Sequence, residues 1–291
     1  MAASERTRVL RQMCIDVYDR NNSVIDPDFI EKFRRNTPEH FSELFFANAM
    51  HIAGFVSTGR VKGVDFAYKI PGYEGRLFIE VVTPSITDWT GVVKQEIDGL
   101  TFTSMDGRAR QASLLRLTSA FYRKAESFES SICSGHVSEK DIKIIAISGI
   151  KINQEGGWAP EHFGNPPSFS EAFLPIGQMY VPINLSAGAA MFGSASFSYS
   201  NKIDRGQASP VERDAFVSGK FSHIDAVAYS EINLSYAERS ADQIGVLYNP
   251  TSLNAGKISS IGMSADYHVA ISSHDFSITR HIREDLSDLK L

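Results

Sequence analysis

The chain has 291 residues, 43% of them hydrophobic and 22% charged, which is enough apolar material for a sizeable core and excludes a wholly disordered protein. Its net charge is −5 and its isoelectric point is about 5.9, so it lacks the basic excess of proteins that coat nucleic acid. A nucleic-acid enzyme is still compatible with this charge, because a local basic groove can lie on an acidic body.

Two cysteines, Cys14 and Cys133, restrict the covalent chemistry. They form no CxxC motif and are too few for a disulfide framework, so cysteine-held zinc is not expected. The N-terminal residues contain no apolar segment of a secretory signal, and no apolar run approaches the roughly 20 residues that cross a bilayer. We therefore expect a cytoplasmic protein without a membrane partner.

The first third of the chain predicts helices followed by a hairpin. The expected helices cover 4–20, 27–35 and 39–53. Thr37 is expected to cap the third helix, Pro38 suits its first turn, and Gly54 ends it. The expected strands cover 64–70 and 76–82, with Gly72 and Gly75 framing the turn between them.

The rest of the chain predicts one long helix and then mostly strands. Residues 85–108 are polar and irregular, which predicts a loop or mobile flap, and a helix is expected from about Gln111 to Cys133. The expected strands cover 141–150, 178–185, 223–232 and 243–250, with weak alternation over 265–279. Composition predicts a surface loop over 151–175, a hairpin or loop over 186–206, and a charged helix or frayed end over 281–291.

This order predicts an α/β fold with a mixed central sheet flanked by helices. A helix that joins the strands near 80 and 145 favours a right-handed crossover between parallel strands. We expect a single domain over 1–291, with an N-terminal helical segment over about 1–36 and a charged C-terminal tail over about 280–291.

Three acids stand out because their surroundings are apolar. Side chains alternate across a strand, so Glu80 in the run LFIEVV shares one face with Phe78 and has no other polar side chain nearby. A buried carboxylate costs several kcal/mol unless it has a partner. Asp65 lies in the preceding strand and can reach the same face across the hairpin. Glu43 lies in an apolar stripe of the third helix. Such acids repel one another unless a cation neutralises them, and their oxygens favour Mg²⁺ or Mn²⁺.

The order of these acids resembles the core of the PD-(D/E)XK nuclease superfamily. Glu43 on a helix, the run GVDF with Asp65 and the run FIEVV with Glu80 carry the resemblance. It implies a restriction-endonuclease-like core in which Asp65, Glu80 and the backbone carbonyl of Val81 bind the metal and Glu43 is an auxiliary acid.

The chain departs from that superfamily at the lysine that helps to activate water. This lysine follows the second acid by two residues, and that position is Val82 here. Some members supply it from a neighbouring helix, and the run RLTSAFYRKAESF offers Lys124. Arg116 and Arg123 lie nearly in line with it as candidate substrate contacts. If no such side chain reaches the metal, the resemblance implies an inactive site.

A wider similarity covers roughly residues 40–255. The runs IEVVTP, RLTSAFYRK, DIKIIAIS, HIDAVAYS and VLYNP are similar to a group of uncharacterised bacterial proteins. This similarity is more specific than the acid pattern, but it implies no substrate.

Structural interpretations compete with these roles. Glu80 could be a buried acid paired with Arg116 or Arg123, while Asp65 and Glu43 could be surface acids. Lys124 could be a solvated helix lysine. The eight histidines form no HExxH motif, which disfavours zinc, and the aromatic residues over 158–173 suit loop packing better than base stacking.

The leading hypothesis is Mg²⁺-dependent phosphodiester hydrolysis by a DNA nuclease of defence or restriction. The alternative is an inactive module on the same fold that binds nucleic acid or protein, which the missing lysine motif and the acidic charge favour. A glycosidase with a Glu/Asp pair fits less well, because acids in a hairpin suit a metal better. Nucleic acid, DNA before RNA, is the expected partner, residues 85–108 and 186–206 are substrate-contact regions by position alone, and a homodimer is left open.

Overall fold

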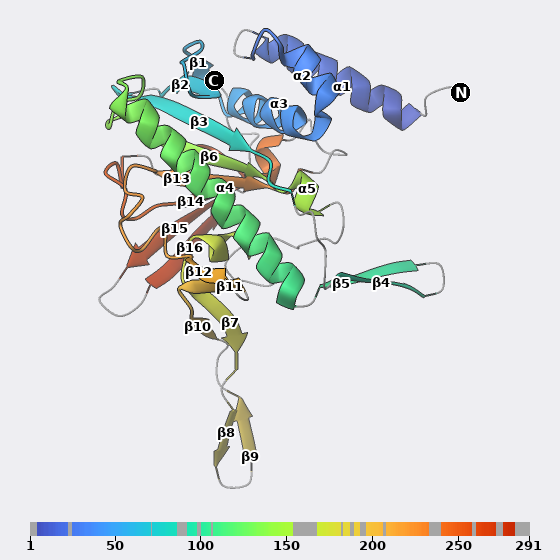
Figure 1. Cartoon of the computed structure of the whole chain (residues 1–291), viewed down its shortest axis with the longest axis vertical. Helices are drawn as coiled ribbons and strands as arrows, with labels where there is room; N and C mark the ends of the chain where they lie inside the picture. Colours follow the sequence, from blue (N-terminus) through green and yellow to red (C-terminus); the bar gives the residue numbers. More distant parts are fainter. Residues whose placement is uncertain are drawn as a thin grey trace.

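The computed structural model contains, in its described residues, an eight-stranded mixed sheet with helices on both faces (Figure 1). The structure describes residues 5–22, 25–70, 72–85, 92–97, 100–105, 107–153, 168–181, 183–186, 189–192, 196–205, 208–232, 240–257, 260–271 and 276–282. The helices are α1 (Glu5–Asn21), α2 (Phe29–Arg35), α3 (Thr37–Ile52), α4 (Gly107–Cys133) and α5 (Ile150–Asn153), with a 3-10 helix η1 (Ser168–Ala172). The fold class predicted from the sequence, α/β with a mixed central sheet between helices, is therefore confirmed.

The described strands of the central sheet lie in the order β1-β2-β3-β6-β13-β14-β15-β16. Their bounds are β1 (Val56–Ser57), β2 (Phe66–Lys69), β3 (Arg76–Val82), β6 (Ile142–Ser148), β13 (Ala226–Ser230), β14 (Gly245–Tyr248), β15 (Ala265–Ile271) and β16 (Phe276–Ile282). β3, β6 and β13 are parallel, β14 and β15 are parallel, and the other neighbouring strands are antiparallel. Because α4 connects β3 to the parallel strand β6, it is the predicted crossover helix.

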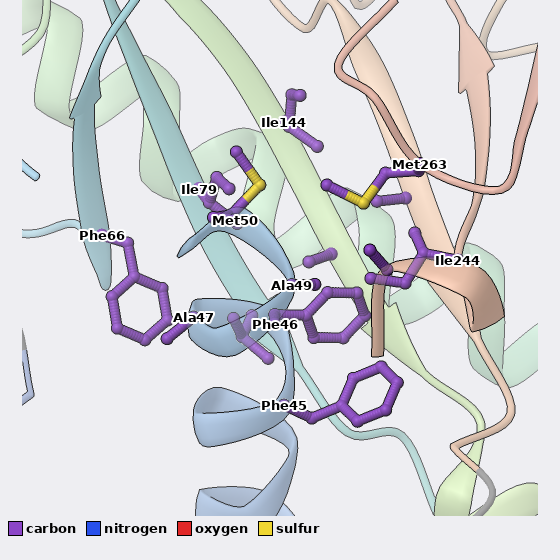
Figure 2. Close-up of a cluster of buried hydrophobic side chains, with 14 of the residues drawn as sticks. Phe45, Phe46, Ala47, Ala49, Met50, Phe66, Ile79, Ile144, Ile244 and Met263 are labelled. Carbon is purple, nitrogen blue, oxygen red and sulfur yellow. The ribbon is translucent and has the colours of Figure 1, made fainter. Parts of the chain in front are cut away.

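Two apolar layers hold the helices on the sheet. In β3, Leu77, Ile79 and Val81 join the layer under α1–α3, whereas Phe78 joins the layer under α4, as the alternation of this strand predicts. Figure 2 shows side chains of α3, including Phe46 and Met50, beside strand residues of the first layer.

Local chemistry sets the bounds of α3. Its N-cap is Asn36, and the hydroxyl of Thr37 donates instead to the carbonyl of Phe33 at 2.9 Å, so the prediction that Thr37 caps this helix is wrong. Pro38 lies in the first turn, as expected. The helix ends before Gly54, whose φ of +82° is a conformation that glycine adopts without a steric penalty.

Among the described residues, four two-stranded antiparallel sheets project from, or pack beside, the central sheet (Figure 1). Their described strands are β4 (Val92–Ile97), β5 (Leu100–Met105), β7 (Ile176–Tyr180), β8 (Ile183–Ser186), β9 (Ala189–Phe192), β10 (Ser196–Tyr199), β11 (Lys202–Arg205) and β12 (Ala208–Glu212). The loop predicted for 85–108 is therefore wrong where β4 and β5 pair, because a two-stranded hairpin can form without a strongly apolar pattern. The single strand predicted over 178–185 is two strands, β7 and β8.

The surface loop predicted for 151–175 is wrong in its last part. Phe169 and Phe173, in and directly after η1, are buried in the layer under α4. Packing, the alternative to base stacking, therefore accounts for these two aromatic residues. Trp158 and Phe163 lie outside the described residues, as do 283–291, most of the predicted C-terminal tail, whose first residues belong to β16.

The longest described helix is α4, with 27 residues, and it begins about one turn before the predicted start at Gln111. One side of it is apolar and packs on the sheet, while Arg116, Ser119 and Arg123 are exposed. Among the described residues, no helix combines the length and apolar character needed to cross a membrane.

Candidate functional site

The hairpin of β2 and β3 brings Asp65 and Glu80 together. Phe66 pairs with Ile79, so extending the register by one residue sets Asp65 opposite Glu80. Both carboxylates then lie on the side of the sheet that α4 covers. The backbone N–H of Val81 donates to Asp65 Oδ2 at 2.7 Å, which fixes the orientation of that carboxylate from inside the hairpin.

Helix α4 completes the group with a lysine and a serine one turn apart. Lys124 Nζ donates to Glu80 Oε2 and lies 3.3 Å from Asp65 Oδ2. Ser127 Oγ donates to the other oxygen of Glu80, Oε1, at 3.2 Å. We refer to Asp65, Glu80, Lys124 and Ser127 as the acid–lysine cluster. Residues from β3, from the end of the loop before β2 and from α4 thus converge on one ammonium group.

The acid–lysine cluster is buried at one end and open at the other. The side chain of Glu80 is 4% exposed, whereas those of Lys124 and Asp65 are 24% and 33% exposed. Burial raises the pKa of the Glu80 carboxyl, although Lys124 opposes the shift. Burial alone would lower the pKa of Lys124, but Asp65 and Glu80 together outweigh it, and the net pKa is raised. Lys124 is therefore held as a cation between the two acids.

The third predicted acid, Glu43 on α3, lies close enough for the charges of Asp65 and Lys124 to affect its pKa, but its side chain has a different partner. Its Oε2 is 3.1 Å from Nδ1 of His40, one turn earlier on the helix. Burial raises the pKa of the Glu43 carboxyl, and the negative charge of Asp65 adds to the shift, while His40 and Lys124 oppose it. The structure therefore brings two of the three acids into contact with Lys124 and leaves Glu43 paired with His40 nearby.

The predicted substrate contacts, Arg116 and Arg123, are both exposed on α4. Seven residues separate them, so they occupy nearly one stripe of the helix, and Lys124 is turned from Arg123 by about 100° toward the sheet. The described hydrogen bonds of the Glu80 side chain come from Lys124 and Ser127, which rules out the interpretation that either arginine is its partner in this structure.

The donor chemistry of the acid–lysine cluster fits a hard divalent cation. Asp65, Glu80 and the carbonyl of Val81 would hold it, and Mg²⁺ is commonly bound by one or two carboxylates with several waters. The ammonium of Lys124 lies between these two carboxylates, where a bound cation would also neutralise their charge. Within the described residues, however, no group of three or more His, Cys, Asp and Glu side chains is arranged to hold a metal ion.

Sequence reasoning missed two members of the site, Ser127 and His40. Each lies three residues from a partner on the same helix, Ser127 from Lys124 and His40 from Glu43, so helical spacing was the available signal. Spacing alone does not distinguish them from other polar residues of the two helices. No family model, no curated protein and no solved structure matches the chain.

Proposed function

We propose that the chain is a Mg²⁺-dependent nuclease with a restriction-endonuclease-like core whose reaction centre is the acid–lysine cluster. The observation that carries the proposal is the convergence of Asp65, directly before β2, and Glu80, in β3, on a single cationic group. A lysine supplied by α4 would replace the one that the PD-(D/E)XK pattern has at the position of Val82. Two carboxylates, one nearly inaccessible to water, favour the binding of positive charge.

The residues of the site would divide the work as follows. Asp65 and Glu80 would hold Mg²⁺, with the carbonyl of Val81 as a further ligand. When bound, this ion polarises a phosphoryl oxygen and lowers the pKa of a coordinated water. The Lys124 ammonium stabilises the negative charge that develops on the phosphoryl oxygens. Glu43, whose pKa burial raises, is suited to accept or supply a proton.

Arg116 and Arg123 extend this proposal to a substrate with many phosphates. Both side chains are exposed. They lie on the same stripe of α4 as Ser127, because the three residues fall within about 40° of one another around the helix axis. Arginine forms paired hydrogen bonds with phosphate oxygens. We expect these arginines to position a nucleic-acid backbone, with DNA preferred.

A second candidate function, an inactive binding module, is favoured by one specific observation. Lys124 and Ser127 supply a hydrogen bond to each oxygen of Glu80, so the buried carboxylate is satisfied without a metal. Such a module would bind nucleic acid or protein whether or not Mg²⁺ is present.

The test is a cleavage assay on plasmid DNA, single-stranded DNA and RNA with Mg²⁺, with Mn²⁺ and with a chelator. Glu80→Gln and Asp65→Asn should each reduce cleavage at least about 100-fold, because even the loss of an outer-shell partner of a metal costs up to about 100-fold. Glu126→Gln, an exposed acid of the same helix, is the matched control and should cleave like the wild type.

Cleavage that needs the divalent ion and both acids would support the nuclease. Binding of nucleic acid that is equal with metal and with chelator, and without cleavage, would favour the inactive module. Cleavage that survives in both variants would place the reaction centre elsewhere in the chain.

A further inference from the structure

We propose that Lys124 is a built-in counter-ion that competes with the divalent cation for Asp65 and Glu80, and so sets how tightly the site binds metal. This inference rests on the proposed metal site, and it concerns the regulation of that site rather than the cleavage reaction. It predicts an exchange between two bound cations, one of which belongs to the protein.

The first support is the charge balance of the acid–lysine cluster. Two carboxylates face one ammonium group, and Glu80 is almost completely removed from water. A buried carboxylate without a positive partner is strongly disfavoured. While both acids are ionised the site therefore needs a cation, and Lys124 provides it whenever no metal is bound.

The second support is that neutral donors also hold the two carboxylates. Ser127 donates to Glu80 Oε1 at 3.2 Å, and the backbone N–H of Val81 donates to Asp65 Oδ2 at 2.7 Å. Neither bond depends on Lys124. When the ammonium leaves, the acids keep their orientation, which preserves a formed site for an incoming cation.

The third support is the access of Lys124 to solvent. Its side chain is partly exposed, and lysine carries its charge on a flexible four-carbon stem that can place the ammonium in water. Asp65, its neighbour in the cluster, is also partly exposed, so the open end of the cluster admits an ion. The incoming metal would then replace the ammonium on the same two oxygens, Glu80 Oε2 and Asp65 Oδ2.

The consequence is that removing the ammonium should strengthen metal binding. We would titrate Mg²⁺ and Mn²⁺ into the wild type and Lys124→Met by calorimetry, and measure the melting temperature of each with and without the ion. Lys124→Met should melt below the wild type without metal, bind the ion at least about 10-fold more tightly, and gain more in melting temperature from it. Equal or weaker metal binding in Lys124→Met would overturn the proposal.

Further variants keep the test decisive if Lys124→Met does not fold. Lys124→Arg retains the charge and should bind the ion no more tightly than the wild type, whereas Lys124→Gln should bind it more tightly. Equal affinities in these two variants would count against the competition. Lys140→Met, which removes an exposed lysine, is the control and should leave metal affinity unchanged.

The outcomes for this inference and for the proposed function are distinguishable. Tighter metal binding in Lys124→Met, together with no cleavage by the wild type, would support the competition and reject the nuclease. Cleavage by the wild type, with metal affinity that is unchanged in Lys124→Met, would support the nuclease and reject the competition. Absence of metal binding in the wild type and in every variant would reject both.

Discussion

Lys124, which is partly exposed, and Lys143, which is buried, lie on the same side of the central sheet and have different surroundings. Glu80, the partner of Lys124, shares a face of β3 with Phe78, and Phe78 pairs with Lys143 on β6. Each lysine is close to a buried carboxylate, Glu80 in one case and Asp225 in the other. The two groups therefore allow one kind of ion pair to be compared in two settings.

The ammonium of Lys143 donates its hydrogen bonds to backbone carbonyls. Its Nζ donates to the carbonyls of Asp141 and, at 3.0 Å, Glu139, while the nearest oxygen of Asp225 is 3.8 Å away. The side chain is 1% exposed, and burial lowers its pKa although Asp225 opposes the shift. Asn254 donates to the same two carbonyls, so this group is a closed network.

The hydrogen bonds recorded for the ammonium of Lys124 end on carboxylates, and its pKa is raised. The surroundings of each ammonium therefore indicate which lysine is suited to exchange its partners. A lysine enclosed by backbone carbonyls stabilises one conformation, whereas a lysine held by two acids at an open edge can give way to another cation. Burial alone does not distinguish the two, because both clusters contain a carboxylate that is almost inaccessible to water.

The network around Lys143 should give the greatest loss of stability when its lysine is replaced. Lys143→Met leaves Asp225 without its cation and removes one of the donors to the surrounding carbonyls, so it should lower the free energy of unfolding by about 3–5 kcal/mol. Urea denaturation followed by circular dichroism measures the change. Added Mg²⁺ should not restore the lost stability, and restoration would show that this network also binds metal.

Removing the lysine of the acid–lysine cluster should cost less stability. Lys124→Met should lower the free energy of unfolding by about 2 kcal/mol in the absence of metal, because water already reaches part of Lys124 and Asp65. The same urea experiment measures it, and Lys140→Met, at an exposed lysine, is the matched control. A loss as large as that of Lys143→Met would mean that the two clusters are equally closed.

The pH dependence of stability should separate Lys124→Met from the wild type. Glu80 has a folded-state pKa above its ordinary value of 4.5, so the folded state holds the proton more tightly. Its contribution to the free energy of unfolding therefore falls as pH rises from 4.5 through the folded-state pKa. Without Lys124 that pKa rises further and the fall becomes larger.

The destabilisation by Lys124→Met should accordingly grow as pH rises above the ordinary carboxyl value of 4.5. Urea denaturation at a series of pH values measures it for both proteins. Parallel stability curves would show that the charge of Lys124 does not act on Glu80.

The smallest expected effect concerns the serine that orients Glu80. Ser127→Ala removes one hydrogen bond to a buried carboxylate and should cost about 1 kcal/mol. Ser130→Ala is the matched control on α4, because the hydroxyl of Ser130 is exposed and donates to the backbone of Glu126. The control should change stability by no more than about 0.5 kcal/mol. Thermal denaturation measures both changes, and equal losses of stability would show that the hydrogen bond from Ser127 to Glu80 does not contribute to the site.

The predictions from sequence succeeded where a short pattern and its surroundings carried the signal. The strand over 76–82 was predicted to the residue, and its alternation placed Glu80 on the buried side that α4 covers. They failed where the signal was weak, as over 85–108, or where polar loop composition hid buried residues, as at Phe169. Hairpins such as β4–β5 depend on pairing between backbones more than on side-chain pattern.

Local periodicity in the sequence was enough to predict part of this structure. The hydrophobic pattern of β3 requires a buried strand, and an acid within it requires a partner, because an isolated carboxylate is costly in an apolar layer. Tertiary packing, which no local pattern shows, makes Lys124 and not Arg116 or Arg123 this partner. The rotation of α4 against the sheet makes that choice, and the packing of the whole apolar layer beneath the helix sets the rotation.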